Sequence, residues 1–115
     1  MPPFYTAMEK RKELFYTAWM REAIVERHFT VTVKALGGIS YKFVSPGTSG
    51  VADQIACLPD GSTWFVEIKK PKGSRTAPLQ HLFAADMARL KQHYTRLYTT
   101  EAIDQWAINQ QRNID

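Results

Sequence analysis

Cysteine is almost absent from this 115-residue sequence, and long apolar runs are missing altogether. Cys57 is the sole cysteine, so no intrachain disulfide can form, and a reducing cytoplasm, bacterial or phage-infected, is the expected compartment. No run reaches the roughly 18 apolar residues that a membrane-spanning helix needs, and the first residues lack the apolar core of a signal peptide. These absences argue against disulfide-stapled and membrane-spanning classes of protein.

The residues that are present suit a folded domain with a real core. Hydrophobic residues make up 44% of the chain and charged residues 23%, which are ordinary values for a globular protein. The length suffices for one domain and is too short for two, so residues 1–115 are expected to fold as a single unit. The formal net charge of +4 permits a polyanionic partner without requiring one.

Local patterns predict elements in the order α–β–β–β–α–β–α. The run from Thr6 to Glu9 is typical of a capping box, and apolar residues at helical spacing continue until Gly37 and Gly38 end the helix. This first segment, 7–36, forms either one helix or two broken near Thr17. The remaining elements are strands at 39–44, 51–58, 62–69 and 96–100, and helices at 78–94 and 101–111, the last capped by Thr99 or Thr100. This order predicts an α/β fold whose mixed sheet is antiparallel in its first part and flanked by helices.

Charged residues interrupt an otherwise apolar hairpin. Leu58-Pro59-Asp60-Gly61 suits a type I turn followed by a left-handed glycine, which gives a three-residue loop. Residue 58 then faces residue 62, and Asp53 faces Glu67 on one side of the sheet. Lys69 projects from the same side, two residues beyond Glu67. A two-residue loop would instead put the two carboxylates on opposite faces.

Two facing carboxylates repel each other unless a cation lies between them. Lys69 could supply that charge, and so could Mg²⁺, Mn²⁺ or Ca²⁺, because these metals prefer oxygen ligands. The residues alone leave two interpretations open, which are a metal site and a surface cluster of ion pairs.

The motifs around this hairpin resemble the VRR-NUC family of the PD-(D/E)XK nuclease superfamily, in particular its stand-alone virus and phage type. The resemblance covers about residues 22–100 and rests on "GG" after a helix, "SPG" and "SG" before Asp53, "VEIKKP" at the second strand, and "PLQ" at the next helix. The family usually has Pro before the metal-binding Asp, where this chain has Ala52. The resemblance implies a restriction-endonuclease-like core.

The resemblance also implies roles for individual residues. Asp53 and Glu67 would be the metal-binding carboxylates, the main-chain carbonyl of Ile68 a further ligand, and Lys69 the catalytic lysine. Gln80 of "PLQ" would lie beside the active centre. The preceding helix would contribute a glutamate to the metal site, where it would hold the metal, a second metal or water; Glu26 fits best and Glu22, one turn earlier, competes. Ordinary surface positions are the alternative for both Glu26 and Gln80.

The expected activity is metal-dependent cleavage of DNA. The resemblance implies Mg²⁺ or Mn²⁺ as cofactor, no nucleotide cofactor, attack by water, and a homodimer that cuts branched DNA in the manner of a Holliday junction resolvase. Alternatives are a nuclease that cuts linear duplexes or flaps, and a DNA-binding protein that keeps the fold without the chemistry. Basic residues near the site are candidates for phosphate contacts, although solvated surface charge explains them equally well; they are Lys70, Lys72, Arg75 and, less strongly, Lys42.

Overall fold

The computed structural model describes residues 7–70 and 76–115. Its elements, in chain order, are α1 (Ala7–Ala35), β1 (Ile39–Lys42), β2 (Gln54–Cys57), β3 (Thr63–Glu67), α2 (Thr76–Arg89), β4 (His93–Arg96) and α3 (Thr100–Ile114). The first segment is thus one unbroken helix, which agrees with the first of the two predicted alternatives. Thr6, the start of the predicted capping box, lies outside the described residues.

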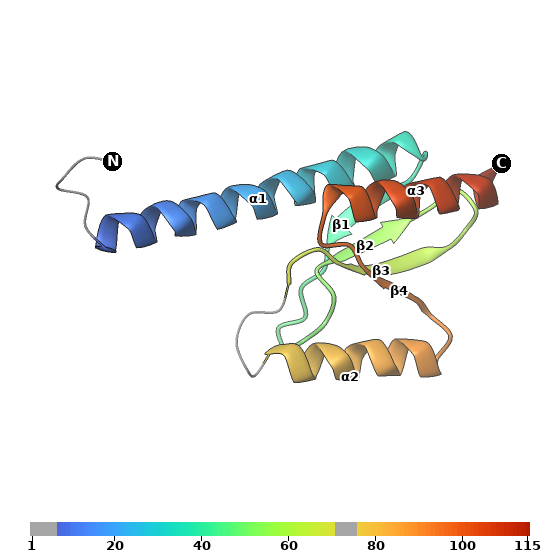
Figure 1. Cartoon of the computed structure of the whole chain (residues 1–115). Helices are drawn as coiled ribbons and strands as arrows, with labels where there is room; N and C mark the ends of the chain where they lie inside the picture. Colours follow the sequence, from blue (N-terminus) through green and yellow to red (C-terminus); the bar gives the residue numbers. More distant parts are fainter. Residues whose placement is uncertain (1–6, 71–75) are drawn as a thin grey trace.

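Four strands form one mixed sheet in the order β1-β2-β3-β4. The first three are antiparallel neighbours, and β4 pairs with β3 in parallel. Figure 1 shows α1 and α3 side by side on one face of this sheet and α2 on the other. The predicted class, a mixed sheet that is antiparallel in its first part and flanked by helices, is confirmed.

The hairpin between β2 and β3 has the loop that its sequence predicts. The N–H of Leu58 donates to the carbonyl of Ser62 (2.9 Å), and the N–H of Gly61 closes the turn on the carbonyl of Leu58 (3.0 Å). Gly61 adopts the left-handed conformation, with φ of 88°. The register is therefore the predicted one, with Cys57 opposite Thr63 and Gln54 opposite Val66.

The core lies between the sheet and the pair α1 and α3. Phe29 and Val33 of α1, Val66 of β3 and Ile103 of α3 are completely buried there. The rings of Phe29 and Trp106 lie 5.7 Å apart, so the two helices share one apolar layer. On the other face, Phe83 of α2 packs edge-on against Phe65 and against Tyr94. Apolar packing on both faces thus fixes β3, the strand that carries Glu67.

Two predicted boundaries around α2 are wrong. The helix was expected at 78–94, but it ends at Arg89, and Tyr94 belongs to β4. The strand expected at 96–100 accordingly lies at His93–Arg96. Lys91 follows the helix in the left-handed conformation (φ 58°), which turns the chain back along the sheet. The terminal helix is correct in kind, and Thr99 is its N-cap.

The N-terminal part of α1 extends beyond the rest of the molecule (Figure 1). The radius of gyration is 16.8 Å, whereas a compact domain of 100 residues has about 13 Å. Residues 7–14 and 16–21 are exposed all round the helix. Within the described ranges, none of the helices combines the length and the apolar character required to cross a membrane.

Candidate active site

The chain bends at Asp53, where β2 begins. Gln54 is the partner of Val66 in the ladder, and the N–H of Asp53 also donates to the carbonyl of Val66 (3.1 Å). Two residues therefore oppose one, which is the pattern of a β-bulge. The regular ladder that was predicted to place Asp53 directly opposite Glu67 stops one position short. Bulges of this kind often redirect a side chain beside an active site.

Beyond the bulge, the Asp53 carboxylate accepts main-chain hydrogen bonds in place of a strand carbonyl. Its Oδ2 accepts hydrogen bonds from the main-chain N–H groups of Ile68 (2.9 Å) and Lys69 (2.8 Å). Charge-assisted bonds of this type are about twice as strong as neutral ones. Asp53 is thus held by the segment that follows Glu67, with Oδ1 left as the oxygen that can face another group.

Glu67 is fully buried at the end of β3. Its Oε2 accepts hydrogen bonds from the hydroxyls of Tyr94 (2.9 Å) and Tyr98 (3.3 Å), and the Arg96 Nε lies 3.5 Å from it. Its Oε1 is buried without a hydrogen-bond partner among the described residues. One oxygen of this carboxylate is therefore anchored, and the other is an unsatisfied acceptor, which costs free energy unless a cation or donor reaches it.

Burial raises the pKa of the Glu67 carboxyl above its ordinary value. The Tyr94 hydroxyl opposes this shift by hydrogen bonding the carboxylate, and the negative charge of Asp53 adds to it. Burial likewise raises the pKa of Tyr94 to about 12, so this hydroxyl stays protonated and donates.

Three residues that surround Glu67 were not predicted from the sequence. Tyr94, Arg96 and Tyr98 follow one another at a spacing of two, which is the signature of one face of a strand. This signal was overlooked because Tyr94 also continued the helical spacing of the preceding segment. Arg96 donates to the Tyr94 hydroxyl (3.1 Å), so the three side chains form one connected group around the buried carboxylate.

A cavity of about 140 Å³ lies beside Asp53. Glu26 of α1, Gln54 and Lys69 are among the residues that line it, and Glu67 is not. Gln54 donates to Glu26 Oε1 at 3.5 Å. The structure thus brings Glu26, Asp53 and Lys69 to one cavity, whereas the competing Glu22 lines a neighbouring one.

The remaining predicted residues differ in their surroundings. Gln80 is buried in the first turns of α2, and its Oε1 has no hydrogen-bond partner among the described residues. The chain that leads to Asp53 packs closely against this turn of α2. A Cβ atom added to Gly50 would lie only 2.5 Å from the Leu79 Cβ, so the close approach requires glycine at this position. Lys42 Nζ pairs with Glu26 Oε1 at 3.1 Å. Lys70 is exposed near the Tyr98 ring, while Lys72 and Arg75 lie outside the described residues.

The donor set suits a divalent cation such as Mg²⁺ or Mn²⁺. Glu67 offers a buried oxygen that lacks a partner, and Asp53 offers a second carboxylate that is held in place by two N–H groups. These are hard oxygen donors, and hydrogen bonds to the other oxygen of a ligating carboxylate are typical of metal sites. No cluster of three or more His, Cys, Asp or Glu positioned for a metal occurs within 7–70 and 76–115. Binding of a divalent cation here would therefore depend on the Asp53 and Glu67 carboxylates and on a main-chain carbonyl oxygen.

Comparison with known proteins supports a nuclease relationship. No protein-family model matches the chain. The chain is 48% identical over 61 residues to “Putative nuclease p44” of Acyrthosiphon pisum secondary endosymbiont phage 1. That match covers 53% of this chain and 64% of the relative, so it spans less than two thirds of the relative's length. The chain also resembles a solved structure of a VRR_NUC domain, with 27% identity and a TM-score of 0.66 over 74% of this chain and 91% of that one.

Proposed function

Because this chain is a member of the VRR-NUC family, we propose that it is a metal-dependent endonuclease that hydrolyses phosphodiester bonds in DNA. The observation that carries the proposal is the pair of carboxylates at the start of β2 and the end of β3. Asp53 is fixed by two main-chain N–H groups, and Glu67 is buried with one oxygen unsatisfied. A purely structural role does not explain why a small domain buries a carboxylate without satisfying both oxygens.

Asp53 and Glu67, with the main-chain carbonyl of Ile68, would hold Mg²⁺ or Mn²⁺. When bound, the cation supplies a water molecule of lowered pKa and neutralises charge on the phosphate. The protein's part is to hold these oxygens in position. The Tyr94 and Tyr98 hydroxyls orient Glu67 through Oε2, and the bulge directs Asp53 toward the main chain of 68–69.

Lys69 is the residue proposed to stabilise the transition state. Its side chain lines the cavity beside Asp53, where an ammonium group can lie near the attacking water and the charged phosphate. Glu26 lines the same cavity and would orient water there. Gln80, whose buried Oε1 lacks a partner in the described structure, would hold water from the α2 side.

A cleavage assay tests the proposal directly. The purified chain is incubated with a four-way junction, a flap and a linear duplex, each with Mg²⁺, with Mn²⁺ and with EDTA. We expect cleavage with metal and none with EDTA, and preference for the junction would support a resolvase-like substrate. If none of the three is cut with either metal, the chain is a DNA-binding protein on a nuclease fold, and the enzymatic proposal is wrong.

The Lys69→Ala variant tests the mechanism. We expect a loss of cleavage of at least a hundredfold with nearly unchanged DNA affinity, because the lysine acts mainly on the transition state. Lys34→Ala is the matched control, since Lys34 is an exposed lysine in the last turn of α1, away from the site. Near-normal turnover by Lys69→Ala would refute the assigned role.

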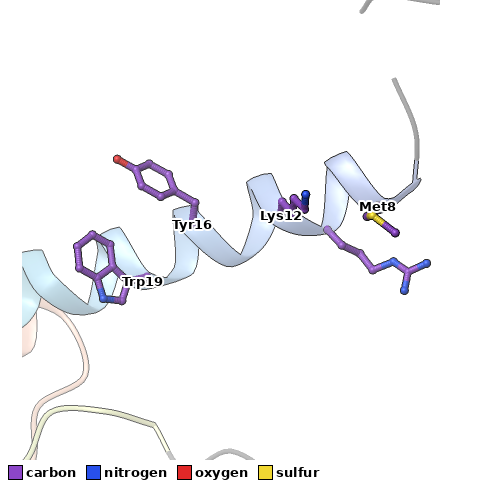
Figure 2. Close-up of a pocket in the computed structure, with 5 residues that line it drawn as sticks. Met8, Lys12, Tyr16 and Trp19 are labelled. Carbon is purple, nitrogen blue, oxygen red and sulfur yellow. The ribbon is translucent and has the colours of Figure 1, made fainter. Parts of the chain in front are cut away.

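The proposal includes a homodimer formed through α1. Figure 2 shows Met8, Lys12, Tyr16 and Trp19 on the projecting part of this helix, where they line a shallow hollow. Exposed apolar residues continue along the helix as Met20, Ile24 and Val31. Tyr16, Met20 and Ile24 are four residues apart, so they share one face. An exposed apolar stripe of this length is typical of an interface, and the same helix of a second copy offers a matching stripe around a twofold axis. Two sites related by a twofold axis would suit the two strands of a branched DNA.

A further inference from the structure

A second cavity lies next to the proposed metal site, on the other side of Ile68. It has a volume of about 220 Å³ and lies between α1 and the segment that follows β3. Ala18, Val25 and Ile68 form its apolar walls, and the Tyr98 side chain contributes an aromatic surface. Ile68 also lines the cavity beside Asp53, so the two cavities share one residue as a wall.

We propose that this cavity receives the base of an unstacked nucleotide next to the cleaved bond, with Tyr98 as the stacking residue. The inference rests on the proposed nuclease function and adds a specificity-determining contact to it. Drug-sized ligands occupy pockets of roughly 300–1,000 Å³, so the smaller volume here suits a single base. Aromatic side chains are the usual stacking partners of unpaired bases, because every base presents a π-face.

The charges at the cavity favour a nucleotide over an apolar partner. Arg21 and Lys70 are exposed cations that line it, and Glu22 is the one acidic side chain among its lining residues. Lys70 Nζ lies 5.9 Å from the centroid of the Tyr98 ring. A base that stacks on this ring would displace the ammonium group, which could then pair with the phosphate of the same nucleotide. The cavity thus carries two cations against one carboxylate, and this excess of positive charge favours a phosphate-bearing ligand over an apolar peptide or lipid.

Tyr98 connects this cavity to the metal site. Its hydroxyl donates to Glu67 Oε2 at 3.3 Å, so the ring that would stack on a base also orients the proposed metal ligand. Tyr98 therefore acts as a positioning residue as well as a stacking surface. A substrate that fills the cavity would hold the tyrosine, and through it Glu67, in place.

The test uses junction or flap substrates with a single abasic residue moved one nucleotide at a time across the cleavage position. We expect one position at which the missing base lowers kcat/KM by about tenfold for the unmodified chain. Tyr98→Phe keeps the ring and should keep this penalty. Tyr98→Ala and Ala18→Phe should abolish it, the latter by filling the cavity, whose lining residues do not include Glu67. Tyr41→Ala is the control, because Tyr41 is an exposed aromatic on β1.

A binding measurement separates this inference from the proposed function. The Lys69→Ala chain is mixed with the same DNA carrying 2-aminopurine at the sensitive position, or, if no cleavage occurs, at each position in turn. We expect a change in fluorescence of at least twofold at one position, which Ala18→Phe removes in the same background. If cleavage occurs but no position is sensitive to base removal, the cavity takes no base while the nuclease proposal stands. A base-dependent signal without cleavage would support the cavity and refute the enzyme.

Discussion

Asp53 shows how one side chain can replace main-chain pairing. Two facing acids would suggest that neutralising Asp53 relieves repulsion, but its Oδ2 accepts two main-chain N–H groups at the bulge. We therefore expect Asp53→Asn to lower the free energy of unfolding of the metal-free chain by about 1–2 kcal/mol. Chemical denaturation in EDTA measures this. Asp86→Asn on the exposed face of α2 is the control and should change stability by less than about 0.5 kcal/mol.

Glu67 should have the opposite effect on stability. Its pKa is raised in the folded state, so the folded chain binds more protons than the unfolded chain as pH rises through and above the ordinary glutamate range. Stability in EDTA therefore falls over that window and stays lower above it. Glu67→Gln removes this titration, and we expect the variant to be more stable than the unmodified chain at pH 7 by on the order of 1 kcal/mol, with little difference near pH 4. An equal gap at both pH values would contradict the burial of a charged carboxylate.

Metal addition supplies a second measurement on the same variant. A cation that binds only the folded chain raises its melting temperature in proportion to the logarithm of the metal concentration. We expect Mn²⁺ to raise the melting temperature of the unmodified chain and to leave that of Glu67→Gln unchanged. An equal shift in both proteins would place the metal away from Glu67.

Among the elements, the hairpin was predictable because its register depends on a few local residues. Pro59, Asp60 and Gly61 set the loop length, and Asp60 further fixes the turn by accepting from the Ser62 N–H and hydroxyl. The bulge at Asp53 was not predictable, because it depends on hydrogen bonds to Ile68 and Lys69 across the sheet rather than on neighbours in sequence. The sequence thus located the carboxylates on adjacent strand ends but not the way in which each is held.

The helix ends also differ in whether neighbouring residues in the sequence predict them. The end of α1 was predictable from Gly37. The N–H of Gly37 donates to the carbonyl of Lys34, and the N–H of Gly38 donates to the carbonyl of Val33, which is the hydrogen-bond pattern of a Schellman motif. The end of α2 has the same pair of bonds, from Lys91 to Ala88 and from Gln92 to Met87, but without a glycine. Because the sequence carries no stop signal there, the helix was expected to continue to residue 94.

This difference between the two helix ends can be measured. Lys91 adopts a φ of 58°, a backbone conformation that is unfavourable for residues with a side chain and is readily adopted by glycine. We expect Lys91→Gly to raise the free energy of unfolding by about 0.5 kcal/mol, and Gly37→Ala, at a φ of 89°, to lower it by about 1 kcal/mol. Thermal and urea denaturation give both values. A loss of stability in Lys91→Gly would mean that the Lys91 side chain stabilises the fold by more free energy than its left-handed backbone conformation loses.

At the scale of the whole molecule, the long axis of 57 Å against a shortest axis of 21 Å follows from the projecting helix. Helices of this length are seldom stable in water with one apolar stripe exposed, because most helical stability in proteins comes from packing that stripe. A partner surface would therefore stabilise the projecting part of α1, and the proposed second copy would supply one without any further protein. The proposed dimer does not depend on the metal site, so it can be tested independently of catalysis.

The dimer predicts a difference between two equally exposed aromatic residues. Trp19 is 56% exposed on the projecting helix, and Tyr41 is 60% exposed on β1. We expect Trp19→Glu to convert the dimer to a monomer at micromolar concentration, because a buried unpaired carboxylate at each of two symmetry-related positions opposes association. Tyr41→Glu should leave the dimer intact. Light scattering coupled to size-exclusion chromatography distinguishes the two states. If the unmodified chain is already monomeric at high concentration, or if Tyr41→Glu dissociates it while Trp19→Glu does not, the interface does not lie on α1.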